Sequence, residues 1–257
     1  MSAERQLGEY PAMKRIMLTV AYDGTAYHGW QIQPNGETIE SVLNRCLSEL
    51  LQEQVEVSGA SRTDAGVHAL GNLAVFDTET RIPADKIAYA LNDRLPEDIR
   101  IQRSIEVADS FHPRYTESRK TYEYKILNRT FPLPNRRFDT YFYHYPLDVD
   151  KMGEAGAYLV GEHDFVSFCS AGAQVKSTVR RIDLCEINKQ QDIITIRITG
   201  NGFLYNMVRI IAGTLICVGG GNMEPEQVRK IILAKDRGAA GPTAPACGLT
   251  LVGYEFL

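Results

Sequence analysis

The sequence predicts an α+β fold made of two halves, each of the split βαβ type. Segments with the alternating pattern of strands and segments with the spacing of helices follow one another twice along the 257 residues. Each half also contains neighbouring strands that can form a hairpin. No repeat is visible at the level of residues, so the duplication is one of pattern.

The first half opens with a strand and a helix. Apolar residues alternate over 15–22, which predicts a strand. The leucines of 39–51 recur at helical spacing and predict an amphipathic helix with Thr38 as its N-cap. Ser41 stands where a capping box usually has glutamate, so we expect the box to be incomplete.

The rest of the first half is predicted to contain two strands, a helix and a third strand. Val55 and Val57 alternate with a polar residue ahead of the loop around Asp64, and the apolar run 73–77 follows that loop. Pro83 is well placed to begin a helix that extends to about residue 95. A further strand is predicted over 99–107.

The second half follows the same plan. Its predicted strands cover 121–127, 179–188, 193–199 and 249–256, and its predicted helices cover 149–160, 203–218 and 225–234. The glycine tract 219–222 ends the long apolar helix. The boundary between the halves falls in the polar stretch 108–118, which contains Pro113. We therefore expect a disordered extension over 1–13, an N-terminal half over 14–110 and a C-terminal half over 118–257.

The overall composition is that of a globular protein with an acidic balance. Hydrophobic residues make up 44% of the chain, the net charge is −4 and the pI is about 5.8. An acidic total gives no reason to expect nucleic acid, so local charge must decide. Between residues 112 and 137 only Glu117 and Glu123 oppose a run of basic residues: Arg114, Arg119, Lys120, Lys125, Arg129, Arg136 and Arg137. Lys176, Arg180 and Arg181 form a second cluster, and such clusters are either solvated faces or sites that attract phosphates.

The cysteines and histidines are scattered along the chain. Cys46, Cys169, Cys185, Cys217 and Cys247 form no CxxC pair and no ligand cluster with the histidines, so we expect free thiols in the cytoplasm and no metal. The N-terminal residues lack the apolar core of a signal peptide. The longest apolar run, 207–218, is interrupted by Arg209 and is too short to cross a bilayer, so no membrane partner is expected.

One loop combines an arginine and a carboxylate among small residues: Ser61-Arg62-Thr63-Asp64-Ala65-Gly66-Val67-His68-Ala69. Gly59 and Gly66 give the loop backbone freedom, and a loop of this kind can hold Asp64 at a fixed place. Taken alone, an aspartate in a turn more commonly bonds backbone amides, and Arg62 is equally compatible with a surface salt bridge.

Arg209 lies within a run of apolar residues, 207–213. A buried guanidinium is costly unless an anion accompanies it, so its head group must meet a carboxylate, reach a cleft or extend to water. Asp64 is the natural carboxylate partner, and an arginine beside it would favour its ionised form.

Two further residues are ambiguous on the sequence alone. Tyr122 and Tyr124 alternate in the predicted strand 121–127 and therefore share a face, and tyrosines on strands are usually packing residues. Leu249 begins the last predicted strand and has the pattern of a core leucine.

These motifs together resemble a known family. The segment 61–69 is similar to the active-site loop of the TruA-type tRNA pseudouridine synthases, whose usual form is Gly-Arg-Thr-Asp-Ala-Gly-Val-His-Ala, with Ser61 in place of the glycine. The segments around Tyr122, Arg209 and Leu249 also match. The resemblance extends over nearly the whole chain, in the family's order, through Tyr22-Asp23-Gly24-Thr25, Gly29-Trp30-Gln31 and Gly161-Glu162-His163-Asp164-Phe165.

The resemblance implies a pseudouridine synthase fold, in which two ferredoxin-like halves share a central, mostly antiparallel sheet with the active cleft between them. It implies an isomerase that converts uridine to pseudouridine at positions 38, 39 and 40 of the tRNA anticodon stem-loop, acts as a homodimer and needs no cofactor. In such a site Asp64 is the nucleophile, Arg62 holds the target nucleotide out of the stack and Tyr122 stacks on the uracil. Arg209 pairs with Asp64, and Leu249 lines the pocket.

Two other classes of function stay open at this point. Split βαβ halves with aromatic residues on their strands also resemble RNA-recognition folds, so a non-catalytic RNA-binding module or RNA chaperone is the alternative. A nucleoside or glycoside hydrolase is the other, although standard glycosidase chemistry uses two carboxylates and no second acid accompanies Asp64 in its motif.

Overall fold

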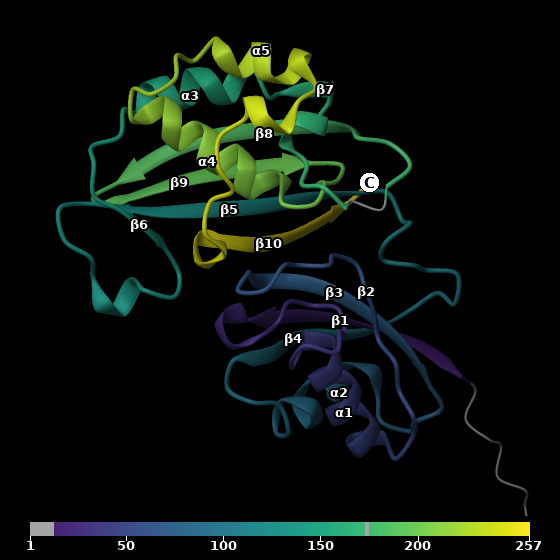
Figure 1. Ribbon diagram of the computed structural model, residues 1–257. Coiled ribbons are helices and arrows are strands. Elements are labelled where there is room, and N and C mark those ends of the chain that lie inside the picture. Colours follow the sequence, from purple (N-terminus) through teal and green to yellow (C-terminus); the bar gives the residue numbers. More distant parts are fainter. Residues whose placement is uncertain (1–12, 173–174) are drawn as a thin grey trace, which may run out of the picture.

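The computed structural model describes residues 13–172 and 175–257, so the predicted disordered extension lies almost wholly outside the described residues. The described residues form a mixed α+β structure around one ten-stranded sheet, with helices packed on it (Figure 1). The α+β prediction is confirmed at this level. None of the helices in the described part of the chain is long and apolar enough to cross a membrane.

The first half contributes one end of the sheet. Its strands are β1 (Lys14–Tyr22), β2 (Ser58–Gly59), β3 (His68–Thr78) and β4 (Ile99–Val107), and its helices are α1 (Ile39–Leu51) and α2 (Ala84–Asn92). β1 pairs antiparallel with both β3 and β4, and the two residues of β2 pair with β3. The two helices lie together against these strands (Figure 1).

The second half contributes the other end. Its strands are β5 (Ser118–Asn128), β6 (Tyr141–Tyr143), β7 (Gly161–Asp164), β8 (Val179–Gln190), β9 (Ile193–Gly200) and β10 (Leu249–Phe256). Its helices are α3 (Val149–Ala157), α4 (Met207–Gly219) and α5 (Gln227–Ala234). The strands from β10 to β7 run in the order β10-β5-β9-β8-β7, and each neighbouring pair is antiparallel.

Short 3₁₀ turns occur in both halves, at Gly24–Ala26, Pro134–Arg136, Val166–Phe168, Arg237–Ala239 and Ala246–Gly248.

The last strand joins the two halves. β10 pairs antiparallel with β5 and parallel with β3, where Thr250 lies opposite His68 and Leu251 opposite Ala69. Figure 1 shows β10 at the seam between the upper and lower parts of the molecule. Segments that are far apart in the sequence therefore meet along this seam.

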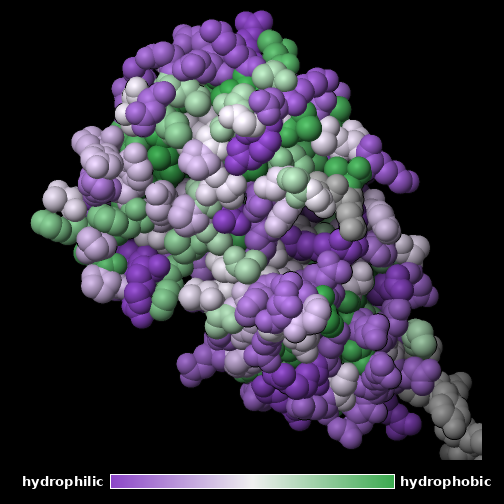
Figure 2. Space-filling model, viewed as in Figure 1, coloured by the Kyte–Doolittle hydropathy of each residue, from purple (hydrophilic) through white to green (hydrophobic). Residues whose placement is uncertain are grey.

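The core follows from the alternation of the strands. Ile16, Leu18 and Val20 of β1 are fully buried in the main cluster, together with Leu43 and Leu47 of α1. On the opposite face of the sheet, a smaller cluster around Met17 and Val75 is covered by Phe111 from the segment that links the halves. Hydrophilic residues cover most of the outward faces of the upper and lower parts in Figure 2.

The capping box of α1 corrects one sequence prediction. Thr38 Oγ1 accepts a hydrogen bond from the Ser41 amide at 3.2 Å, and Ser41 Oγ accepts one from the Thr38 amide at 3.1 Å. A serine hydroxyl can accept as a glutamate carboxylate does, so the box is complete.

The largest difference from the sequence prediction concerns residues 203–206, which were expected to be helical. The helix begins only at Met207, because Asn206 takes the left-handed conformation with φ 60°. A strand precedes the Asp64 loop as predicted, but it is β2 at Ser58–Gly59, because sheet pairing starts after the alternating residues Val55 and Val57. The short edge strand β7 was not predicted; its polar sequence has no alternating pattern.

Candidate active site

The loop between β2 and β3 carries Arg62 and Asp64, and two glycines shape it. Gly66 has φ +77°, a conformation that favours glycine. At Gly59 the requirement is space, because a Cβ there would lie 2.2 Å from the indole nitrogen of Trp30. The predicted backbone freedom is therefore needed at Gly66, whereas Gly59 permits close packing beneath the loop.

A buried hydrogen-bond network fixes the start of this loop. Asn72 is fully buried; its Nδ2 donates to the Ser61 carbonyl at 3.0 Å and its Oδ1 accepts from the Ser61 amide at 3.3 Å. The Tyr254 hydroxyl of β10 donates to Ser61 Oγ at 2.6 Å. Because φ of Ser61 is not positive, a serine fits here without strain, and its hydroxyl ties the loop to the second half.

Asp64 and Arg209 form the ion pair expected from the sequence. Arg209 lies in the first turn of α4, and its Nη1 donates to Asp64 Oδ2 at 3.1 Å. The same nitrogen donates to Asn206 Oδ1 at 2.9 Å, and Nε donates to the Ala244 carbonyl at 2.8 Å. Three acceptors thus orient the guanidinium, which presents one side to Asp64.

Two opposing effects set the protonation of Asp64. Burial raises the pKa of the Asp64 carboxyl, and the positive charge and hydrogen bond of Arg209 lower it by less, so the pKa lies above the ordinary aspartate value. The sequence expectation was right about the sign of the arginine's contribution but left out burial. A poorly solvated carboxylate oriented by a cation is suited to act as a nucleophile.

Tyr122 lies on β5 and faces the same cleft. Its ring meets Phe203 edge to face, with centroids 5.1 Å apart, and the side chain is buried. Burial raises the pKa of Tyr122 to about 12, so the phenol stays protonated at neutral pH. This environment suits stacking on a base better than removal of a proton.

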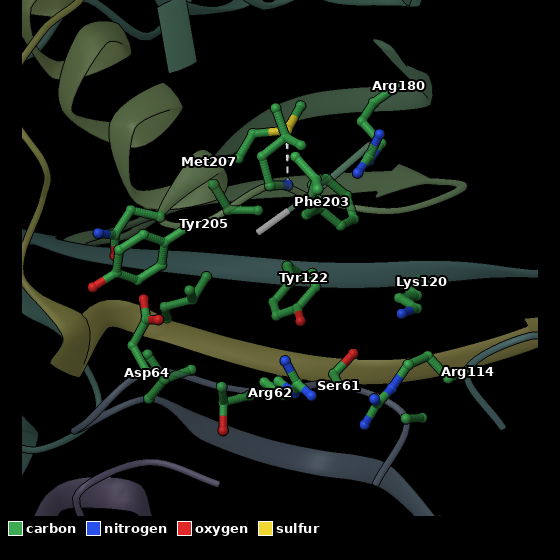
Figure 3. Close-up of a pocket in the computed structure, with 18 of the residues that line it drawn as sticks. Ser61, Arg62, Asp64, Arg114, Lys120, Tyr122, Arg180, Phe203, Tyr205 and Met207 are labelled. Carbon is green, nitrogen blue, oxygen red and sulfur yellow. Dashed lines mark hydrogen bonds between the residues drawn. The ribbon is translucent and has the colours of Figure 1, made fainter. Parts of the chain in front are cut away.

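The cleft has a volume of about 570 Å³, within the range of ligand sites. Arg62, Asp64, Tyr122 and Leu249 all line it, whereas Arg209 supports Asp64 from outside the lining. Figure 3 shows Asp64 and Tyr205 at one end, Tyr122 and Phe203 near the middle, and Arg114, Lys120 and Arg180 at the other end.

Several lining residues were not assigned to the site from the sequence. Phe203, Tyr205 and Asn206 were placed in a helix, and no signal in their apolar sequence separates them from the helix that follows. Lys120 and Arg180 were recognised as members of basic clusters, but not as neighbours across the cleft. All five cysteines are free thiols, and no group of three or more His, Cys, Asp or Glu side chains in the described ranges is arranged to hold a metal ion.

Comparison with known proteins identifies the family of this chain. The family model for tRNA pseudouridine synthase matches residues 18–116 and 155–256. The chain belongs to this family. Family members are isomerases that act on tRNA, and the resemblance noted from the motifs is confirmed.

The curated relatives match over almost their whole lengths. The tRNA pseudouridine synthase A of Ruminiclostridium cellulolyticum is 50% identical over 245 residues, covering 95% of this chain and 100% of the relative. The protein of the same name from Thermoanaerobacter sp. strain X514 is 48% identical over 240 residues, covering 93% and 98%. That from Bacillus licheniformis is 46% identical over 239 residues, covering 92% and 97%.

Proposed function

We propose that this chain isomerises uridine to pseudouridine at positions 38, 39 and 40 of the tRNA anticodon stem-loop, with Asp64 as the nucleophile. The observation that carries the proposal is the setting of Asp64. Among the described residues that line the cleft it is the only carboxylate, it is held by Arg209, and Tyr122 lies close by. One carboxylate fits an isomerisation through a covalent intermediate, whereas glycosidases ordinarily use two.

The reaction follows from the positions of the side chains. Arg62 is exposed at the tip of the loop, where it can enter the RNA and hold the target uridine outside the stack. The extruded uracil then stacks on Tyr122, with Leu249 lining the pocket. This places the nucleotide against Asp64, whose pKa is raised by burial and whose orientation is set by Arg209.

The chemistry is an isomerisation that leaves the composition of the substrate unchanged, with one proton exchanged. Asp64 attacks, the bond between N1 and C1′ breaks, the uracil turns, and C5 bonds to C1′. The C5 proton is lost to solvent, N1 gains a proton, and the carboxylate is released. Attack at uracil C6 and attack at C1′ each need one carboxylate as nucleophile, and the site is compatible with both. Removal of a sugar proton would use the same carboxylate as a base, without a covalent bond to Asp64.

The proposal includes the domain organisation. The strand order β10-β5-β9-β8 has the arrangement of a split βαβ unit, and β4-β1-β3 with the short β2 supports a reduced unit of the same kind. We therefore propose two ferredoxin-like halves, over 14–110 and 118–257, that share the sheet. The family resemblance supports a homodimer, which light scattering would test, and the free thiols support a cytoplasmic location.

Mapping of the product tests the function. Unmodified tRNA is incubated with the chain, and pseudouridine is located by carbodiimide labelling and reverse transcription. We expect stops at positions 38–40 with wild type and none with Asp64→Asn. Stops elsewhere would overturn the assigned positions. Tight tRNA binding without any stop would instead favour the non-catalytic RNA-binding alternative, and free uracil would indicate a hydrolase.

A further inference from the structure

The cleft holds an excess of positive charge that the proposed chemistry leaves unused. Its lining contains four cationic side chains, Arg62, Arg114, Lys120 and Arg180, against the single carboxylate of Asp64. That carboxylate is already paired with Arg209. Arg62 projects from the catalytic loop and has a role in extrusion, so three cations remain without a function.

Basic residues next to these cations in the sequence do have acidic partners, so the lack of such partners is confined to the cleft. Arg119 and Arg181 lie next to Lys120 and Arg180 on β5 and β8, so they point to the other face of the sheet. Both pair with Asp183, at 3.3 Å and 2.8 Å. Within residues 13–172 and 175–257, Arg114, Lys120 and Arg180 have no carboxylate partner. The basic residues on one face of these strands are thus paired with a carboxylate, and those on the cleft face are not.

The three cations lie close to one another. The charges of Arg114 and Arg180 help burial to lower the pKa of Lys120 to about 8. Arg114 Nη2 donates to the Gly59 carbonyl at 2.9 Å, and Arg180 Nη1 donates to the Ser177 and Val179 carbonyls at 2.9 Å and 2.7 Å. Lys120 Nζ lies 5.5 Å from the centre of the Tyr254 ring. These contacts orient the head groups and leave other N–H donors available, since a guanidinium has five.

Three neighbouring cations with spare donors and no acid partner form an anion site. Tyr122 and Phe203 lie between this cluster and Asp64 (Figure 3). The backbone on one side of a nucleotide whose base stacks on Tyr122 can extend to this cluster. We infer that Arg114, Lys120 and Arg180 bind one backbone phosphate next to the target uridine, an inference that rests on the proposed function. The phosphate oxygens accept hydrogen bonds from all three cations, which fixes the sugar while the base is free to turn.

Binding of a fluorescent anticodon stem-loop RNA tests this site, with Asp64→Asn as the common background so that no turnover occurs. We expect Lys120→Gln and Arg180→Gln each to weaken binding about tenfold, as loss of one charged hydrogen bond would. The slope of log K against log salt should fall by about one. The matched controls Arg119→Gln and Arg181→Gln remove equal charge from the other face and should change affinity less than twofold. Equal losses in all four variants would overturn the inference in favour of diffuse electrostatic attraction.

Neutral phosphates identify the bound group directly. Single methylphosphonates are placed in turn at the phosphates around the target uridine. At one position the neutral phosphate should weaken binding to the intact cluster about tenfold. The same change should cost the Lys120→Gln variant clearly less, because that variant has already lost one of the three contacts with this phosphate. Additive losses at every position would show that the cluster binds no phosphate.

The outcomes separate this inference from the proposed function. If the wild-type chain forms no pseudouridine, the proposed function fails whatever the cluster variants do. If it forms pseudouridine and the Gln variants bind like the controls, the phosphate site alone is wrong.

Discussion

The two halves place strands in the same relative order but differ at one position. β8 in the second half has twelve residues and pairs along β9, whereas β2, its counterpart beside β3, has two. Because β2 is so short, the chain leaves the sheet at Ala60, and β10 pairs with the remaining edge of β3. The reduced strand thus makes room for both the Asp64 loop and the closing strand, and the candidate site forms where the halves differ.

This comparison assigns different tasks to the halves. The first half contributes Asp64 and Arg62 on a loop, while the second contributes rigid supports: Arg209 from a helix, and Tyr122 and Leu249 from strands. Changes to the loop should therefore affect the chemistry, and changes to its supports should affect how the substrate is held.

Replacement of the loop carboxylate should have the largest effect. Asp64→Asn should lower the release of tritium from [5-³H]uridine-labelled tRNA at least about 10⁴-fold, as removal of a catalytic side chain does elsewhere. The melting temperature at pH 7 should not fall. The raised pKa of Asp64 means that the fold favours the uncharged carboxyl, which the amide mimics. A variant that loses activity together with a large drop in melting temperature would point to a structural role.

Two substitutions of Tyr122 distinguish a role in base stacking from a role in proton transfer. Tyr122→Ala should lower kcat/KM about tenfold to hundredfold, the usual cost of removing one base-stacking partner. Tyr122→Phe should stay within about threefold of wild type, because a phenol with a pKa of about 12 contributes little as a base at neutral pH. Equal losses in both variants would assign the hydroxyl a chemical step.

Lys120 should make RNA binding sensitive to pH near 8. Unbound Lys120 has its pKa lowered to about 8, so it loses its charge as the pH rises through that value. Burial raises the pKa of the neighbouring Tyr254 phenol well above its ordinary value, so that phenol stays neutral over this range. Wild-type affinity should therefore fall several-fold more between pH 7 and pH 9 than that of Lys120→Arg. Parallel pH curves would contradict this.

The smallest effect is expected at Ser61, which ties the loop to β10. Ser61→Gly removes the acceptor of the Tyr254 hydroxyl, although Asn72 Oδ1 still accepts from that hydroxyl at 3.0 Å. The free energy of unfolding in urea should fall by about 1 kcal/mol, and kcat by a few-fold at most. Ser61→Ala is the control for backbone freedom. A hundredfold loss of kcat would mean that the hydroxyl touches the reacting groups.

The sequence predicts the elements whose signals are local. The leucine spacing and Thr38 define α1 at both ends, and alternation defines β1 and β10. The helix prediction for 203–206 is wrong because the apolar composition of this segment suits a helix. In the structure, hydrogen bonds to Arg209 and Ser170 hold Asn206 outside the helix.

The sequence predicts those parts of the site in which a buried charge needs a partner. It misses those in which the pairing register of distant strands determines which side chains meet. A buried arginine requires an anion, which leads from Arg209 to Asp64 across 145 residues. Nothing local to Lys120 shows that Arg180 lies opposite, because that depends on how β5, β9 and β8 pair. The contact of Ser61 with Tyr254, which are 193 residues apart, depends on β10 in the same way.

The central claim is that Arg209, from the second half, sets the reactivity of the Asp64 carboxylate, from the first half. The most direct measurement is the pH dependence of tritium release from [5-³H]uridine-labelled tRNA for wild type and Arg209→Gln. Arg209 is the cation that opposes burial at Asp64, so its removal should raise the pKa of Asp64 and move the acid limb of the profile to higher pH. A uniformly lower profile with the acid limb unmoved would contradict the claim.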